Sequence, residues 1–305
     1  MLVKYLKKLA LFIFPILVFY TALEITLRSI PNDFQEKHAY LNSNSDKIET
    51  LILGSSHSLS FVNPDNLRSN AFNAAQLHQT LKYDYYILNE YHDKLKSLKT
   101  VVLPISYGSF FSSLENSKDK WRIKNYKMYF DYKDVCSPRY SMEIFNGHTP
   151  YQFQDAVNYL SNGKTLITCN TLGFGEEFSQ TPQTDLNHTG AVVAKRHTED
   201  CSFEYYDENL QYITKIIKLC ESNNIKLVLY TAPSYHTYYE NLEDKYLAPT
   251  FETIDTILKD HPNIKYKSYL KDKRFTKDDF RDVDHLNLQG AKKFTEFLEK
   301  ELIES

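Results

Sequence analysis

An almost unbroken apolar run near the amino terminus constrains this chain more than any other feature. Residues 9–27 read LALFIFPILVFYTALEITL, and Glu24 is the one acidic residue in the run. At about 1.5 Å per residue, a helix of this length spans roughly the hydrocarbon core of a bilayer. The run ends without the small residues of a cleavage site, which favours an uncleaved anchor over a secreted leader or a buried core helix.

Basic residues before the run predict its orientation. Lys4, Lys7 and Lys8 precede it, so the positive-inside rule places the short amino-terminal tail in the cytoplasm. We expect residues 1–29 to be a single-pass anchor in the inner, cytoplasmic membrane, with the rest of the chain on the extracytoplasmic, periplasmic side. Glu24 is expected near the outer interface or against a partner helix in the membrane.

Composition excludes several classes of function. The 305 residues include 36 Lys and Arg against 39 Asp and Glu, a net charge of -3, so no overall positive field would attract nucleic acid. No glycine-rich phosphate loop is present, which argues against a nucleotide cofactor. The cysteines lack the spacing of a zinc site. We therefore expect no cofactor, no metal and no nucleic-acid partner.

Short apolar runs alternate with amphipathic segments through most of the remaining chain. Buried strands are predicted at ETLILGSS, AFNAA, TVVLPIS, IKLVLYTAP and IKYKSYL. Amphipathic helices are predicted at QTLKYDYYILNEYHDKLKSL, ENLQYITKIIKLCESNN, FETIDTILKDH and LNLQGAKKFTEFLEKELIE. This alternation predicts an α/β fold whose parallel sheet is covered by helices on both faces.

Two stretches interrupt this rhythm. The polar stretch 30–47 is expected to be a connector between the anchor and a domain over 48–305. The turn-rich stretch at about 111–200 is too long for a plain loop, so we expect an insertion there. It either packs over the carboxyl ends of the strands and shapes a cleft, or elaborates the structure without touching a substrate.

The four cysteines lie far apart, at Cys136, Cys169, Cys201 and Cys220. Two of them could form a disulfide in an oxidising compartment. Cys220 lies in a predicted helix and is expected to be a buried thiol. The pairing of the other three is left open by the sequence.

Two polar segments, more than two hundred residues apart, carry the candidate chemistry. Ser56 follows the first predicted strand in Gly-Ser-Ser-His, where a turn can expose its hydroxyl and offer its backbone N–H to an oxyanion. Asp282 and His285 form Asp-x-x-His before the last helix, so the carboxylate can orient the imidazole toward a serine hydroxyl. Asp284 is a second candidate to orient His285. Taken singly, Ser56 and His285 also suit helix capping.

Together the two segments resemble the SGNH/GDSL hydrolase superfamily, and in style its bacterial cell-envelope O-acyltransferase and esterase branch. The resemblance covers about residues 49–305, apart from the insertion. It implies a three-layer α/β/α, flavodoxin-like fold, and it aligns Ser56 with the nucleophile and Asp282 and His285 with its catalytic partners.

The middle of the chain departs from the pattern of that family. Phe72-Asn73-Ala74-Ala75 stands where Val-Asn-x-Gly is expected, and Pro104-Ile105-Ser106-Tyr107 stands where Gly-x-Asn-Asp is expected. The usual asparagine donor is therefore missing, and Ala75 replaces the glycine whose N–H lines the oxyanion hole in that family. Ser56, Asn73, Ala75 and Ser106 are the candidates to build the oxyanion hole instead.

The resemblance implies a membrane-anchored acyltransferase that O-acetylates a cell-surface polysaccharide through a Ser-His-Asp triad. It also implies a carbohydrate substrate and a multispanning membrane acyltransferase as partner. Two alternatives stay open: a carbohydrate esterase or deacetylase with the same triad, and a non-catalytic polysaccharide-binding protein of envelope assembly.

Overall fold

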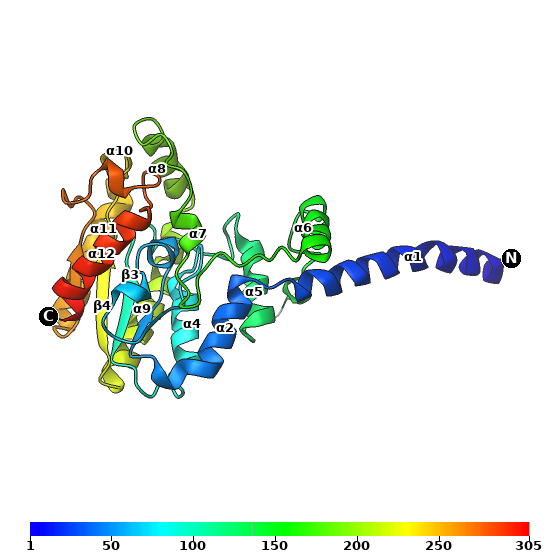
Figure 1. Ribbon diagram of the computed structural model, residues 1–305, viewed down its shortest axis with the longest axis horizontal. Helices are drawn as coiled ribbons and strands as arrows, with labels where there is room; N and C mark the ends of the chain where they lie inside the picture. The colour runs from blue at the N-terminus through cyan, green and yellow to red at the C-terminus, as the bar shows by residue number, and fades with distance from the viewer. Residues whose placement is uncertain (136, 305) are drawn as a thin grey trace. The chain divides into compact units, whose positions relative to one another are not determined.

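The computed structural model describes residues 1–135 and 137–304, and the chain divides into two compact units. The anchor unit comprises Met1–His38 and Lys118–Ile167, and the sheet unit comprises Ala39–Ser117 and Thr168–Ser305. The α-helices are α1 (Leu2–Ser29), α2 (Asp33–Asn44), α3 (Ser56–Leu59), α4 (Leu81–Tyr91), α5 (Ile123–Tyr129), α6 (Thr149–Asn162), α7 (Glu176–Ser179), α8 (Gly190–Glu199), α9 (Tyr206–Ser222), α10 (His236–Tyr239), α11 (Asp244–Asp260) and α12 (Leu288–Leu298). Figure 1 shows their places along the chain.

The sheet unit is built on five parallel strands in the order β2-β1-β3-β4-β5. They are β1 (Thr50–Ile52), β2 (Ala71–Asn73), β3 (Thr100–Pro104), β4 (Lys226–Thr231) and β5 (Lys265–Ser268). Every residue of β1, β2 and β3 is buried, as continuous apolar runs in a parallel sheet require. The order is that of flavodoxin-like folds. The predicted α/β fold with a parallel sheet is therefore confirmed.

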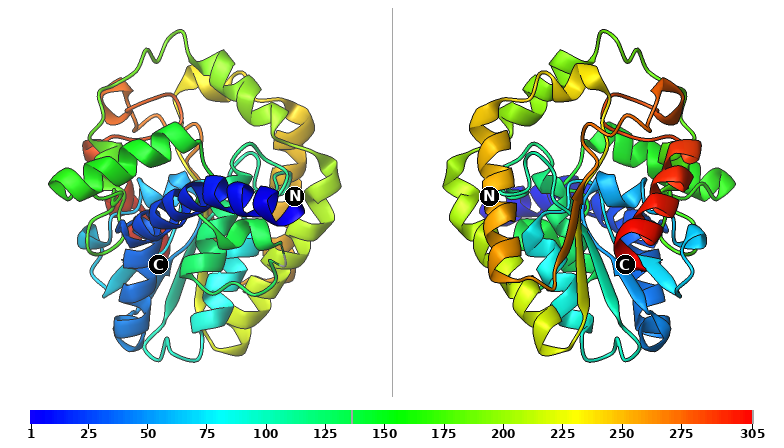
Figure 2. Two further views of the ribbon diagram at one scale, coloured as in Figure 1. Left: turned by 90° about the vertical axis from the view of Figure 1, so that its right-hand side faces the viewer. Right: turned by 90° about the vertical axis from the view of Figure 1, so that its left-hand side faces the viewer.

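Helices cover both faces of this sheet (Figure 2). Connections between parallel strands are right-handed. The chain places β2 on one side of β1 and β3, β4 and β5 on the other, so the connecting helices lie on both faces of the sheet. Helices α4 and α9, which follow β2 and precede β4, pack against each other. Helix α12 covers the other face, where Phe294 contacts Tyr230 of β4 and Phe61 beyond α3.

Phe294 is the centre of an aromatic cluster under α12. Its ring lies 5.2 to 5.3 Å from the rings of Tyr230 and Tyr269 and about 6 Å from those of Phe61 and Phe275. The side chain is fully buried. Burying this much aromatic surface fixes the last helix, and with it the loop that precedes α12.

The anchor unit holds the apolar helix α1, which is long and apolar enough to cross a membrane. Glu24, near its carboxyl-terminal end, is buried and accepts hydrogen bonds from the backbone N–H groups of Glu143 and Ile144, both at 3.0 Å. Leu23 and Leu27 pack with Ala156 of α6. Glu24 therefore has hydrogen-bond partners within its own chain.

The observed division differs from the expected boundaries. The expected connector at 30–47 is helical over most of its length, because Phe34 and Leu41 fall on one face of α2 and both are buried. The expected insertion at about 111–200 is split, since 118–167 joins α1 in the anchor unit and the later part belongs to the sheet unit.

The structure also locates the cysteines it describes. Cys201 and Cys220 carry free thiols, and Cys220 is buried in α9 as expected. Burial raises the pKa of the Cys220 thiol to about 12. Cys136 lies outside the described residues, so a disulfide that involves Cys136 stays a prediction.

Phe294→Ala should destabilise the sheet unit by about 3–5 kcal/mol, because it removes a buried ring that the surrounding aromatic side chains cannot replace. Urea unfolding of the full chain in detergent, followed by circular dichroism, measures the change. Phe297→Ala, at a partly exposed position of the same helix, is the matched control. Equal stability of the two variants would contradict the assignment of Phe294 to the core.

Candidate active site

Ser56 lies at the carboxyl end of β1, as the first residue of α3. The chain turns there at Gly54, whose φ of +114° lies in a region that disfavours other residues. A Cβ at this position would collide with the ring of Pro104 at the end of β3. The turn that presents Ser56 therefore requires glycine.

A buried carboxylate fixes the same turn. The N–H of Gly54 donates to Asp84 Oδ1 at 2.7 Å, and the side-chain amide of Gln79 donates to the same oxygen at 2.7 Å. Burial raises the pKa of Asp84 to about 7, although both hydrogen bonds act to lower it. Sequence analysis did not single out Asp84, because an acidic residue in an amphipathic helix normally faces solvent.

Ser56, His285 and Asp282 form one hydrogen-bonded chain. His285 Nε2 lies 2.9 Å from Ser56 Oγ, and His285 Nδ1 lies 2.9 Å from Asp282 Oδ1. When the imidazole is neutral and donates its Nδ1–H to Asp282, Nε2 can accept a hydrogen bond from the serine hydroxyl. The structure thus brings Ser56 to Asp282 and His285, which lie more than two hundred positions later in the sequence.

The loop before α12 holds this chain in place. Arg281 donates from Nε and a terminal nitrogen to Asp282 Oδ2, at 3.2 and 2.8 Å, and its other terminal nitrogen donates to Phe178 O at 2.6 Å. The N–H groups of Arg281 and Asp282 both donate to His285 O. A forked, charge-assisted contact of this kind orients the carboxylate that in turn orients the imidazole.

Asp284 is a second carboxylate beside His285. It is only 3% exposed, and its Oδ1 lies 3.4 Å from His285 Nδ1. Its Oδ2 faces His57 Nε2 at 3.9 Å and His197 Nε2 at 3.8 Å, and has no hydrogen bond within residues 1–135 and 137–304. One buried carboxylate is thus surrounded by three imidazoles.

These charges set the protonation of the imidazoles in opposite directions. Burial acts to lower the pKa of His285, but the charge of Asp284 and the hydrogen bonding of the Nδ1–H to the two carboxylates outweigh it and raise the pKa to about 10. Burial and the nearby His285 lower the pKa of His57 to about 4. Burial acts to raise the pKa of Asp284, but the three imidazoles hold it well below the usual range.

Three of the four candidate oxyanion donors have other partners. The side-chain amide of Asn73 donates to Ser58 O and Val62 O, at 2.8 and 2.9 Å. The N–H of Ala75 donates to Asn73 Oδ1 at 3.0 Å. Ser106 Oγ shares a hydrogen bond of 2.7 Å with His57 Nδ1. Asn73 and Ala75 therefore close the turn after β2, and Ser106 is hydrogen-bonded to His57, so all three groups have partners within the protein.

The backbone N–H of Ser56 and the side-chain amide of Gln76 have no hydrogen-bond acceptor among the described residues. Ser56 is the first residue of α3, and its N–H donates to no group in the described part of the chain. Gln76 is 3% exposed, its backbone N–H donates to Gly54 O at 3.1 Å, and its side-chain Nε2 has no partner among the described residues. Sequence analysis missed Gln76, although its position just after β2 is a signal for a site residue.

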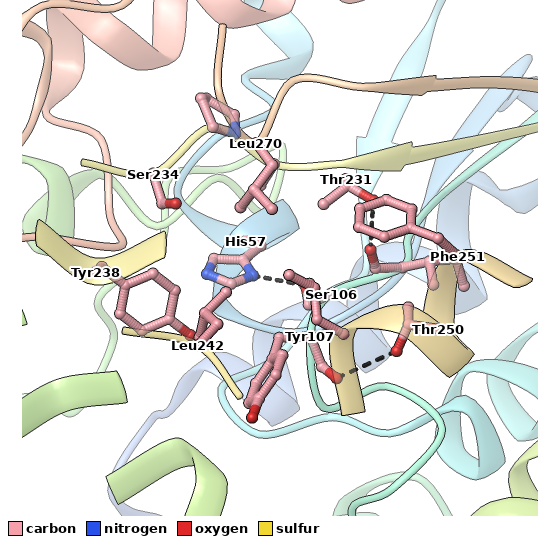
Figure 3. A pocket seen from close by; sticks show the side chains of 14 residues that line it. His57, Ser106, Tyr107, Thr231, Ser234, Tyr238, Leu242, Thr250, Phe251 and Leu270 are labelled. Carbon is pink, nitrogen blue, oxygen red and sulfur yellow. Dashed lines mark hydrogen bonds between the residues drawn. The ribbon is translucent and has the colours of Figure 1, made fainter. Parts of the chain in front are cut away.

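An apolar pocket adjoins His57 (Figure 3). The figure shows the imidazole among Tyr238, Leu242 and Leu270, with its hydrogen bond to Ser106. The ends of β3 and β4 and the start of α11 supply the other walls. Its free volume of about 20 Å³ holds about one water-sized group.

His57, Asp284 and His285 are the group that could hold a metal ion, since each offers a ligand atom within 4.8 Å of the others. Their ligand atoms are largely engaged, however. Both nitrogens of His285 are bonded to Ser56 and Asp282, and Nδ1 of His57 is bonded to Ser106. Only His57 Nε2 and Asp284 Oδ2 remain, so the cluster fits hydrogen bonding to His285 better than metal binding.

No family model and no curated protein matches the chain. Among solved structures, the chain is similar to the crystal structure of a "putative acylhydrolase" from Bacteroides fragilis, with 13% identity, a TM-score of 0.40, and coverage of 86% of this chain and 92% of that one. A likeness at this level carries no argument about activity.

Asp284→Asn should lower the pKa of His285 by at least ~1 unit, because it removes a buried charge that favours the imidazolium. The neutral form of His285 would then persist to lower pH than in the wild type. An NMR titration of the imidazole nitrogens, assigned with His285→Gln, measures the shift. Asp185→Asn, beside the exposed His188, should leave His285 unchanged. An unaltered His285 pKa in Asp284→Asn would contradict the proposed role of this charge.

Proposed function

We propose that this chain is a membrane-anchored serine acyltransferase that O-acetylates a cell-surface polysaccharide from the extracytoplasmic side of the membrane. The hydrogen-bonded chain from Ser56 through His285 to Asp282, with 2.9 Å at both links, is the observation that carries the proposal. The resemblance of both segments to SGNH hydrolases supports the same reaction class.

In the first half-reaction, Ser56 Oγ attacks the carbonyl carbon of an acyl ester while Nε2 of His285 takes the hydroxyl proton. Only the neutral form of His285 can do this, and the raised pKa makes it the minor form at neutral pH. The tetrahedral intermediate collapses as the donor C–O bond breaks and His285 returns the proton to the departing alcohol. The product is an acyl ester of Ser56. Asp282, fixed by Arg281, keeps Nδ1–H directed away from the serine and stabilises the imidazolium.

In the second half-reaction, a sugar hydroxyl attacks the acyl-enzyme and His285 takes its proton. Collapse of this intermediate transfers the acyl group to the sugar and returns the proton to Ser56. If water attacks instead, the products are free acid and the original enzyme, which is the esterase alternative. The two outcomes differ only in which hydroxyl reaches the acyl-enzyme.

The oxyanion is proposed to be held by the N–H of Ser56 and the side-chain amide of Gln76. Both are unengaged in the described residues, and Gln76 is joined by its backbone to Gly54, two positions before the nucleophile.

The anchoring and partners follow from α1. A helix with three lysines before its apolar run would place the sheet unit outside the cytoplasm. Since acyl-CoA is not expected there, a multispanning membrane acyltransferase is proposed to supply the acyl group. A non-catalytic polysaccharide-binding role is the second candidate, and the engagement of Asn73, Ala75 and Ser106 by other groups favours it.

Ser56→Ala should lower ester hydrolysis by roughly 10³-fold or more and abolish labelling by a fluorophosphonate probe, because the nucleophile is lost. The assay uses the full chain in detergent with an aryl acetate, with and without an oligosaccharide acceptor. Ser55→Ala is the adjacent control and should retain both signals. Absence of labelling in the wild type, or equal labelling of the Ser56→Ala variant, would favour the non-catalytic polysaccharide-binding role.

Gln76→Leu should lower kcat by roughly 10²-fold with little change in KM, because an oxyanion donor acts mainly in the transition state. Gln180→Leu, at an exposed position, is the control. Circular dichroism should show both variants to be as stable as the wild type. A parallel rise in KM at unchanged kcat would place Gln76 in substrate binding instead.

A further inference from the structure

Helix α6 carries an apolar face that no other described part of the anchor unit covers. Phe153, Val157 and Leu160 are spaced i, i+4 and i+7, and are 48%, 40% and 73% exposed. Gln154 and Asn158 lie on a different face and hydrogen-bond to each other at 3.0 Å. A short helix with one apolar and one polar face is amphipathic, and an exposed apolar face of this kind points to a covering surface.

The neighbour of this face in the anchor unit is α1. Ala156 packs with Leu23 and Leu27, and the ring of Phe153 lies 6.2 Å from that of Phe19. Figure 1 shows α6 beside the carboxyl-terminal part of α1. The apolar face of α6 is therefore continuous with the exposed apolar surface of the helix that is long enough to cross a membrane.

The positions along α1 that contact α6 indicate which surface covers the apolar face of α6. At about 1.5 Å per residue, Phe19 lies roughly 12 Å inward from Leu27, the last residue of the apolar run, and Leu23 lies roughly 6 Å inward. Helices that lie in a membrane interface bury their apolar face ~5–10 Å into the boundary of headgroups and acyl chains. Ala156 thus contacts α1 at the depth expected of such a helix, and the ring of Phe153 reaches slightly deeper.

We propose that α6 is an interfacial helix that inserts Phe153, Val157 and Leu160 into the outer boundary of the bilayer around α1. The inference rests on the membrane anchoring proposed above, and is independent of catalysis. The contacts of Glu24 with the N–H groups of Glu143 and Ile144, just before α6, hold this segment against α1 at the same level. A lipid surface, rather than a protein, is the occupant because the face continues the lipid-facing surface of α1.

Single tryptophans placed on the full chain test the proposal. In a Trp121→Phe background, which removes the one native tryptophan, Leu160→Trp reports on the apolar face of α6 and Gln154→Trp on a polar face. Phe14→Trp, in the middle of α1, is the positive control for insertion, and the exposed Val192→Trp of α8 is the control for water. The proteins are reconstituted in vesicles of dioleoylphosphatidylcholine and dioleoylphosphatidylglycerol, with or without lipids brominated on the acyl chain.

We expect blue-shifted emission and strong bromolipid quenching for Leu160→Trp and Phe14→Trp, and weak quenching for Gln154→Trp and Val192→Trp. Quenching of Phe14→Trp without quenching of Leu160→Trp overturns the role of α6 and leaves the anchor intact. Failure to quench Phe14→Trp overturns both. Blue-shifted but unquenched emission from Leu160→Trp means that protein, such as a second copy of the chain, covers the face, which also overturns the proposal. Val157→Trp provides the same readout if Leu160→Trp fails to fold.

Discussion

The turn at the end of β1 is the constraint on which the candidate site depends. The backbone must reverse direction at Gly54 while Pro104 of the neighbouring strand packs directly against it. Only a residue without a Cβ fits, and the N–H exposed by the turn is bonded to the buried carboxylate of Asp84. A rigid turn matters here because Ser56 follows it by two residues, and a hydroxyl that is held in one position needs little reorganisation to meet His285.

Charge around His285 is the second determinant of what the site can do. Asp282 and Asp284 approach the same imidazole nitrogen, but from different environments. Asp282 is paired with Arg281, whereas Asp284 is enclosed among imidazoles and has one oxygen without a hydrogen bond in the described residues. The charge of Asp284, which Arg281 does not pair with, therefore has the larger influence on the protonation of His285. His57 and Ser106 extend this polar cluster to the edge of an apolar pocket.

The contacts of Glu24 are central to the structure of the anchor unit. A carboxylate in an apolar helix is costly in a membrane unless it is bonded, and Glu24 accepts two backbone N–H groups from the segment before α6. These hydrogen bonds, together with the ion pair between Glu24 and Arg28, stabilise the charge and hold the segment before α6 against α1. The turn-rich stretch that appears in the sequence as one insertion thus belongs to two units. Its first part packs with α1 in the anchor unit. Its later part places His197 beside Asp284 and Phe178 beside Arg281 in the sheet unit.

The sequence by itself determined the apolar helix, the parallel α/β fold and the residues Ser56, Asp282 and His285, because each depends on a local pattern: a long apolar run, apolar strands alternating with amphipathic helices, or a short motif at a strand end. Only the tertiary structure decided the hydrogen-bond partners. Asn73, Ala75 and Ser106 looked like free donors but are bonded elsewhere, while Asp84, Asp284 and Gln76 gained their importance through burial. The physical reason is that hydrogen bonding and desolvation depend on neighbours brought close by folding, and a pattern of residue types along the chain does not specify those neighbours.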